Sequence, residues 1–146
     1  MSQKLRIGRY SEPGRIYLIT LVCAHRRQFF TDLKAGRIPV RIMKLLSSDA
    51  ETLCYVVMPD HIHWLLTLGM NKSLQKLVQQ MKSLSAKSLH KSAFPGEQIW
   101  QKGFHDRALR REEDVRQVAR YVIANPLRAG LVRSLREYPL WDVKWL

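Results

Sequence analysis

Two histidines separated by one residue are the side chains whose type and spacing most suggest chemistry. His61 and His63 open an apolar run, residues 61–68, that follows a Pro59-Asp60 turn signal. Alternate side chains of a β-strand share a face, about 6.6 Å apart along the strand, so both imidazoles are predicted to point the same way. Two imidazoles placed like this can hold one divalent cation, if a third ligand completes the site. Two ordinary half-exposed histidines are the alternative.

A tyrosine and an asparagine near the end of the chain form a second constellation. Val118, Tyr121 and Asn125 lie at positions i, i+3 and i+7 of a predicted helix and therefore on one face. The phenolic oxygen of Tyr121 can act as a nucleophile, and the amide oxygen of Asn125 suits a hard cation such as Mg²⁺ or Mn²⁺. The alternatives are a core tyrosine beside Val122 and an asparagine that caps the helix before Pro126. The pair gains a joint function only if this helix covers the histidine face.

The charge of the chain favours nucleic acid as the partner. The 25 Lys and Arg residues exceed the 12 Asp and Glu residues by 13 among 146 residues. Such an excess favours phosphate contacts and counterion release, whereas a solubilising or ribosome-associated surface is the alternative. A predicted helix over residues 73–91 carries a lysine stripe within an arc of about 100°. We interpret this stripe, with a merely solvated face as the alternative, as a DNA contact formed by Lys72, Lys76, Lys87 and Lys91.

Composition also argues against a membrane or secreted protein. No apolar run approaches the roughly 20 residues that span a bilayer, and residues 1–10 lack the apolar stretch of a signal peptide. Cys23 and Cys54 fit no C-x-x-C pattern and lie in apolar, strand-like stretches. We therefore expect a cytoplasmic protein whose two cysteines are buried free thiols.

The elements that must position these side chains have the predicted order β-α-β-β-α-β-α. We predict strands over residues 15–23, 52–58 and 61–68 and one within 99–109. We predict helices over residues 36–48, 73–91 and 112–125, with Ser73 as an N-cap and Pro39 in the first turn of its helix. The first six elements form the split βαβ pattern of an α+β, ferredoxin-like fold, an antiparallel sheet with two helices on one face.

The last predicted helix then remains for the open face of the sheet. Residues 61–68 alternate, and their apolar side must meet the helical layer, which places the histidines on the opposite side. That apolar side consists of Ile62, Trp64, Leu66 and Leu68. We treat residues 1–146 as one domain with a basic N-terminal arm, residues 1–14, and a C-terminal tail, residues 133–146, that packs back on the body.

Four sequence blocks between Arg9 and Tyr138 resemble the REP-associated tyrosine transposases. REP denotes a repetitive extragenic palindrome, and the family is similar to the single-tyrosine, IS200-like transposases of the HUH endonuclease superfamily. The M-P-D-H-x-H and Y-x-x-x-N-P-x-R-A-G blocks are specific in combination. The four blocks are Arg9-Tyr10…Pro13-Gly14…Tyr17…Thr20, Met58-Pro59-Asp60-His61-Ile62-His63, Trp100-Gln101…Phe104…Asp106, and Tyr121…Asn125-Pro126…Arg128-Ala129-Gly130-Leu131.

The resemblance implies a metal-dependent enzyme that cleaves and rejoins single-stranded DNA at REP hairpins. It implies that Tyr121 is a nucleophile forming a 5′-phosphotyrosine link, and that His61 and His63 bind the cation with Asn125 as third ligand. It also implies that the tyrosine helix lies over the open sheet face. The chain is expected to act as a monomer, with a homodimer as the alternative because insertion-sequence relatives dimerise.

Basic and aromatic residues outside this site are expected to contact the DNA. Three other functions stay open. One is an RNA-recognition module, although the histidine face of residues 61–68 lacks the aromatic side chains that such modules use. Another is a domesticated protein that binds repeats without cutting them, and the last is a hydrolase that activates water. The expected DNA contacts are Arg6, Arg9, Tyr10, Arg15, Arg26, Arg27, Lys72, Lys76, Lys87, Lys91, Arg110 and Arg111.

Overall fold

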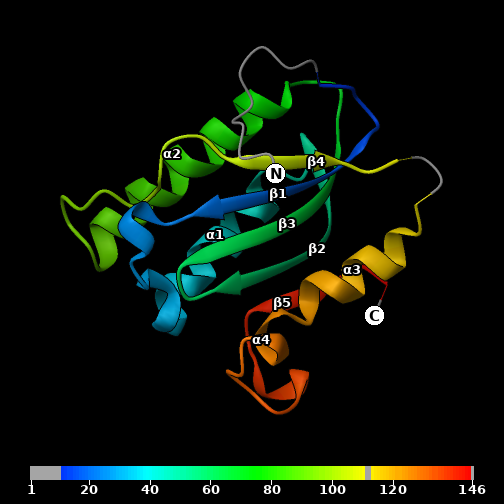
Figure 1. Ribbon diagram of the computed structural model, residues 1–146. Helices are drawn as coiled ribbons and strands as arrows, with labels where there is room; N and C mark the ends of the chain where they lie inside the picture. The colour runs from blue at the N-terminus through cyan, green and yellow to red at the C-terminus, as the bar shows by residue number, and fades with distance from the viewer. Residues whose placement is uncertain (1–10, 111–112, 146) are drawn as a thin grey trace.

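An antiparallel sheet with the strand order β4-β1-β3-β2-β5 organises the chain. The computed structural model describes residues 11–110 and 113–145, and Figure 1 shows their arrangement. The sheet places β3 at its centre, between β1 and β2. The strands are β1 (Ile16–Val22), β2 (Ala50–Met58), β3 (His61–Leu68), β4 (His105–Ala108) and β5 (Trp141–Val143).

Helices cover both faces of this sheet. α1 (Leu33–Leu45) and α2 (Leu74–Ser92) pack on the apolar face, where Trp64 and Leu66 of β3 are fully buried. α3 (Val115–Ile123) packs on the opposite face and contacts β2. A short helix, α4 (Asn125–Arg128), follows it. The predicted ferredoxin-like fold, its strand faces and its additional helix are therefore confirmed.

Polar side chains cap the N-termini of the three longer helices. Ser73 accepts a hydrogen bond from the Lys76 amide and starts α2, as predicted. Asp32 caps α1, which begins three residues earlier than the predicted residue 36, so Pro39 lies inside the helix rather than in its first turn. Short 3₁₀ helices occur at η1 (Ala24–Arg26), η2 (Phe29–Thr31) and η3 (Leu135–Glu137).

The predicted helix over residues 112–125 is wrong at its C-terminal end. α3 starts after the Asp114 cap and stops at Ile123, and Asn125 begins α4 rather than ending α3. Pro126 explains the break, because proline has no N–H to donate to the Val122 carbonyl four residues earlier and its ring clashes with that carbonyl, whereas it is well tolerated in a helix's first turn. Asn125 and Tyr121 therefore belong to two different helices.

The chain end adds a strand that the sequence did not predict. β5 pairs antiparallel with β2, and Cys54 lies opposite Val143. The hydroxyl of Tyr138 donates a hydrogen bond to the Val57 carbonyl, and the Arg116 guanidinium lies 5.3 Å from the centre of a Trp145 ring. The tail thus contacts both the sheet edge and α3.

Both cysteines are buried free thiols, as predicted. Burial raises the pKa of Cys23 and of Cys54 to about 12. Within residues 11–110 and 113–145, no helix has the length and apolar character needed to cross a membrane.

Candidate active site

His61 and His63 lie beside each other on β3, on the sheet face that α3 covers. Their ring centres are 4.9 Å apart and the rings are nearly perpendicular. The strand register places Thr20 of β1 and Val56 of β2 on either side of His63. The alternation of the strand therefore brings both imidazoles to one place, as their spacing predicts.

Each imidazole is held through its Nδ1 atom. His61 Nδ1 donates to the Asp60 carboxylate at 2.7 Å, and His63 Nδ1 lies 3.0 Å from the hydroxyl of Thr20. The other carboxylate oxygen of Asp60 forms an ion pair with Arg26 Nε at 3.2 Å. Contacts of this kind orient a histidine ligand and leave its Nε2 atom for a metal ion.

The electrostatics of the site keep His63 neutral. Burial lowers the pKa of His63 to about 4, with further contributions from the neighbouring His61 and from the positive charge of Arg128. A metal-binding imidazole must be neutral, so His63 is in the required protonation state at neutral pH. The contribution of Arg128 also shows that α4 lies within electrostatic reach of the histidines.

His25 and Arg26, in the 3₁₀ helix that follows β1, adopt an uncommon backbone conformation. His25 and Arg26 both have positive φ angles, 56° and 54°, which non-glycine residues rarely adopt. This conformation occurs in η1, where Arg26 reaches Asp60. The strained turn therefore supports the carboxylate that orients His61.

Tyr121 is an exposed side chain and not a core tyrosine. Its exposed fraction is 66%, whereas the adjacent Val122 is 1% exposed. Tyr121 lines a cavity of about 490 Å³ between β1 and α3, together with Leu18 and Arg107. The guanidinium of Arg128 lies 3.9 Å from the Tyr121 ring centre and donates a hydrogen bond to the Tyr121 carbonyl at 2.7 Å. The phenol is therefore accessible and has a cation beside it.

Asn125 is half-buried at the start of α4. Its amide nitrogen donates to the Val122 carbonyl at 2.6 Å, so the amide oxygen remains an acceptor. The interpretation of Asn125 as the C-cap of the tyrosine helix is wrong, because Ala124 is the C-cap. Among the described residues no group of three or more His, Cys, Asp or Glu side chains could hold a metal ion. Within residues 11–110 and 113–145, a third ligand beside the histidines would therefore be of another type.

Comparison with known proteins identifies the family. The family model described as "Transposase IS200 like" matches residues 14–125, which include both histidines, Tyr121 and Asn125. The chain belongs to the IS200-like transposase family. It is thus an enzyme of the transposase class.

Relatives of this IS200-like transposase carry more specific names. A REP-associated tyrosine transposase of Escherichia coli K12 is 24% identical over 132 residues, which cover 90% of this chain and 78% of that protein. A relative from Haemophilus influenzae is 25% identical over 137 residues, 86% of this chain and 78% of its own. A solved REP-associated tyrosine transposase bound to a REP hairpin has the same fold, with a TM-score of 0.74, 22% identity, and coverage of 94% of this chain and 82% of that one.

The basic residues expected to contact DNA have different surroundings in this transposase. Lys76, Lys87 and Lys91 are exposed along α2. Lys72 is half-buried and bonded to Asp49 and Gln80, so this lysine differs from the rest of the predicted stripe.

The predicted arginine contacts are also varied. Arg27 pairs with Glu97, and Arg26 and Arg15 pair with Asp60 and Glu12. Arg110 lines the Tyr121 cavity. The predicted contacts that lie outside the described residues are Arg6, Arg9, Tyr10 and Arg111.

Sequence reasoning assigned no role to three residues that contact the site. Asp60 precedes His61 directly, and this adjacency was an available signal. Thr20 is 43 residues from His63 along the chain, and only the sheet register brings the two together. Arg128 follows Tyr121 by seven residues. The guanidinium reaches back over the Tyr121 ring because α3 ends and α4 begins between the two residues.

Proposed function

We propose that this IS200-like transposase cleaves and rejoins single-stranded DNA at REP-type hairpins through a covalent 5′-phosphotyrosine link to Tyr121. The observation that carries this proposal is that Arg128 contacts the exposed Tyr121 ring and also lies within electrostatic reach of His63, on the sheet face that α3 covers. Arg128 contacts Tyr121 directly and lowers the pKa of His63, so it links the two halves of the site. The names of the relatives, one of them bound to a REP hairpin, point to the same substrate.

In the proposed step the Tyr121 oxygen attacks the scissile phosphorus. A bond forms between that oxygen and phosphorus, the bond from phosphorus to the 3′-oxygen breaks, and the phenolic proton passes through solvent to the released 3′-hydroxyl. Arg128 stabilises negative charge that develops on the phenol and the phosphate. Reversal by a 3′-hydroxyl of another strand rejoins DNA, and the phosphodiester energy is conserved without a nucleotide cofactor.

The donor set around His61 and His63 fits a divalent cation. Both imidazoles are anchored at Nδ1, His63 is neutral at physiological pH, and Asn125 has an amide oxygen available. We propose that these three side chains hold Mg²⁺ or Mn²⁺. The chemistry such a cation supplies is polarisation of the scissile phosphate.

We further infer that the protein works in the cytoplasm, as a monomer. Buried free thiols suit a reducing compartment. Monomeric action is what the resemblance to REP-associated transposases implies. Light scattering of the purified protein, alone and with DNA, would measure the oligomeric state.

The experiment uses a labelled hairpin oligonucleotide from the palindromic repeats of the genome that encodes the chain. Wild type, Tyr121→Phe and Tyr55→Phe are incubated with it and Mn²⁺ or Mg²⁺, then separated on denaturing gels. Tyr55 is the control because it packs with the apolar face of the sheet, on the side away from the histidines. We expect a metal-dependent DNA–protein adduct with wild type and Tyr55→Phe, and none with Tyr121→Phe.

Two results would contradict the proposal. Cutting without an adduct, unchanged in Tyr121→Phe, would identify water as the nucleophile and the chain as a hydrolase. Tight hairpin binding without cutting or an adduct, repeated with a second repeat sequence, would identify a repeat-binding protein.

A further inference from the structure

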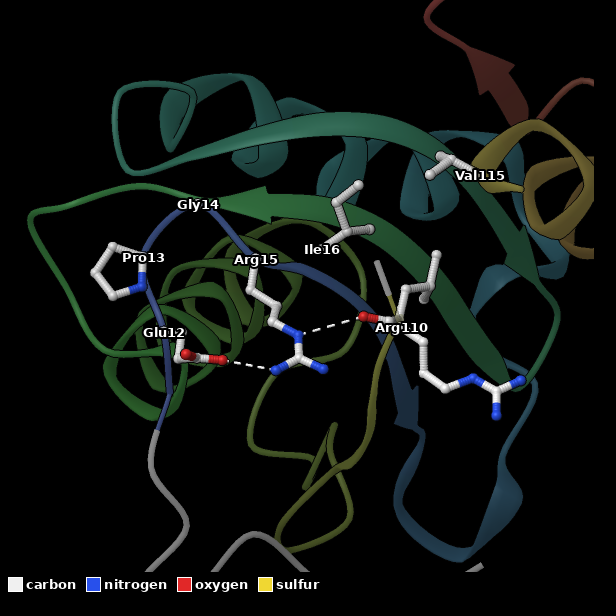
Figure 2. A pocket seen from close by; sticks show the side chains of 8 residues that line it. Glu12, Pro13, Gly14, Arg15, Ile16, Arg110 and Val115 are labelled. Carbon is white, nitrogen blue, oxygen red and sulfur yellow. Dashed lines mark hydrogen bonds and ion pairs between the residues drawn. The ribbon is translucent and has the colours of Figure 1, made fainter. Parts of the chain in front are cut away.

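A second cavity, of about 340 Å³, lies at the start of β1 and the end of β4. Figure 2 shows Glu12 on one side of the Arg15 guanidinium and the apolar side chains of Ile16 and Val115 toward α3. Leu109 and Arg110 complete the wall on the β4 side. The volume is at the lower end of the range for small-molecule sites, which suits a single nucleobase.

The polar wall of this cavity is held in place. Arg15 Nη1 contacts the Glu12 carboxylate at 2.6 Å, and Arg15 Nε donates to the Leu109 carbonyl at 3.3 Å. The backbone amide of Glu12 donates to the hydroxyl of the buried Tyr17 at 2.9 Å. Gly14, with φ +81°, turns the chain and donates to the Leu68 carbonyl. The carboxylate and the guanidinium plane are thus positioned before any ligand binds.

This second cavity continues the Tyr121 cavity along β1. Ile16 lines the cavity at Glu12, Leu18 lines the cavity at Tyr121, and Thr20 contacts His63. These three residues are alternate residues on one face of β1. The four-residue step from Ile16 to Thr20 therefore separates the second cavity from His63 by roughly 13 Å. Arg110 borders both cavities. A strand bound at Tyr121 can therefore extend to Glu12.

We propose that this cavity binds one unpaired guanine of the DNA strand next to the cleavage site, and that Glu12 recognises it. The proposal rests on the proposed function, because it takes single-stranded DNA as the ligand of the Tyr121 cavity. Guanine alone among the DNA bases presents two neighbouring N–H donors, N1 and N2, on its pairing edge. A carboxylate accepts several hydrogen bonds, so the contact to Arg15 leaves acceptor capacity on Glu12.

The same chemistry argues against a phosphate in the cavity. A carboxylate repels a phosphate, whereas it attracts the N–H edge of a base. The guanidinium plane of Arg15 and the side chains of Ile16, Leu109 and Val115 offer flat and apolar surface to a base. Glu12 thus selects the base rather than the backbone.

The test uses a short oligothymidine strand with one central guanine, so that sliding of the strand can place the guanine in the cavity. Replacing guanine by inosine removes only the N2 amino group and leaves the protein unchanged. We expect wild type to bind the guanine strand about tenfold more tightly than the inosine strand, measured by fluorescence anisotropy at one fixed salt concentration. Glu12→Gln should bind the two strands equally, because an amide turns one acceptor into a donor.

Glu97→Gln is the matched control. Glu97 and Glu12 both pair with an arginine and have similar exposed side-chain fractions, 39% and 41%, but they lie at opposite ends of β1. This variant should keep the wild-type preference for guanine. Equal binding of both strands by wild type, or an unchanged preference in Glu12→Gln, would overturn the proposed cavity.

The same protein preparations are tested for the Tyr121 adduct. An adduct without any guanine preference contradicts only the base-binding cavity. If the wild-type protein forms no adduct, the proposed function is contradicted, whatever the preference for guanine.

Discussion

The guanidinium of Arg128 lies over the aromatic ring of Tyr121, 3.9 Å from its centre, and donates a hydrogen bond to the carbonyl of the same residue. The break between α3 and α4 makes this contact, because a continuous helix would carry residue 128 away from residue 121. The guanidinium orients an otherwise exposed ring and places a positive charge beside the phenol. Its charge also contributes to the lowered pKa of His63.

Replacing Arg128 should impair cleavage more than hairpin binding. A cation over an aromatic ring contributes about 0.5–2 kcal/mol, so Arg128→Ala should slow adduct formation by roughly two- to thirtyfold at saturating hairpin. Guanidinium chloride at non-denaturing concentration should restore part of the rate, which a purely structural defect would not allow. Arg136→Ala removes the same charge from an exposed position in η3 and should leave the rate unchanged. A proportional loss of binding and cleavage would contradict this role of Arg128.

Thr20 should determine how tightly the histidine pair binds its cation. Thr20→Val keeps the shape of the side chain but removes the hydroxyl 3.0 Å from His63 Nδ1. Loss of such a partner commonly reduces metal affinity by about 10- to 100-fold, so the Mn²⁺ concentration for half-maximal cleavage should rise accordingly. Thr20→Ser should behave like wild type. Thr67→Val is the matched control, because Thr67 lies on the same face of β3 as His63 but opposite Ile16 rather than Thr20. An equal effect of Thr67→Val would contradict the role of Thr20.

Asn125 variants should separate a ligand from a structural residue. Asn125→Asp keeps an oxygen donor but loses the amide hydrogen bond to the Val122 carbonyl, whereas Asn125→Ala loses both. If Asn125 is the third ligand, Asn125→Ala should need about tenfold more cation and Asn125→Asp should not. Thermal melting measures the structural contribution of the amide. Equal cation requirements in both variants would exclude Asn125 as a ligand.

Much of this site follows from local sequence rules. The period of two in residues 61–68 places His61 and His63 on one face because Trp64 and Leu66 must be buried on the other. The position of β3 at the sheet centre follows from the split βαβ order. Ser73 caps α2 as its side chain predicts.

The rest depends on tertiary structure that no short window contains. The sequence places the end of the tyrosine helix at about residue 125, before Pro126, whereas the missing N–H and the ring of Pro126 end it at Ile123. β5 has three residues, too few for an alternation pattern, and exists because it pairs with β2. The contact between Glu12 and Arg15 is local, but the cavity they line needs β4 and α3 beside them.

The two thiols should be inert in the folded protein. Burial raises the pKa of Cys23 and Cys54 from 9.0 to about 12, which lowers the thiolate fraction at mildly alkaline pH by about a thousandfold. The thiol reagent DTNB should therefore react slowly with native protein and promptly with both thiols in urea.

The raised pKa of the two thiols also means that the folded chain keeps protons that the unfolded chain releases. Its free energy of unfolding should therefore decrease as the pH rises from 9.0 towards 12. Rapid labelling of native protein would contradict this burial.

The exposed lysines of α2 should contribute to the salt dependence of hairpin binding. If Lys76, Lys87 and Lys91 each neutralise a phosphate, replacing all three by glutamine should make the slope of log affinity against log salt shallower by about two to three. A triple variant of α1, Lys34→Gln, Arg41→Gln and Lys44→Gln, changes the net charge equally. It should retain more of the slope if the α2 surface is the contact. Equal slopes in both triple variants would show that only the net charge of the chain attracts DNA, because contacts by particular residues make binding sensitive to position.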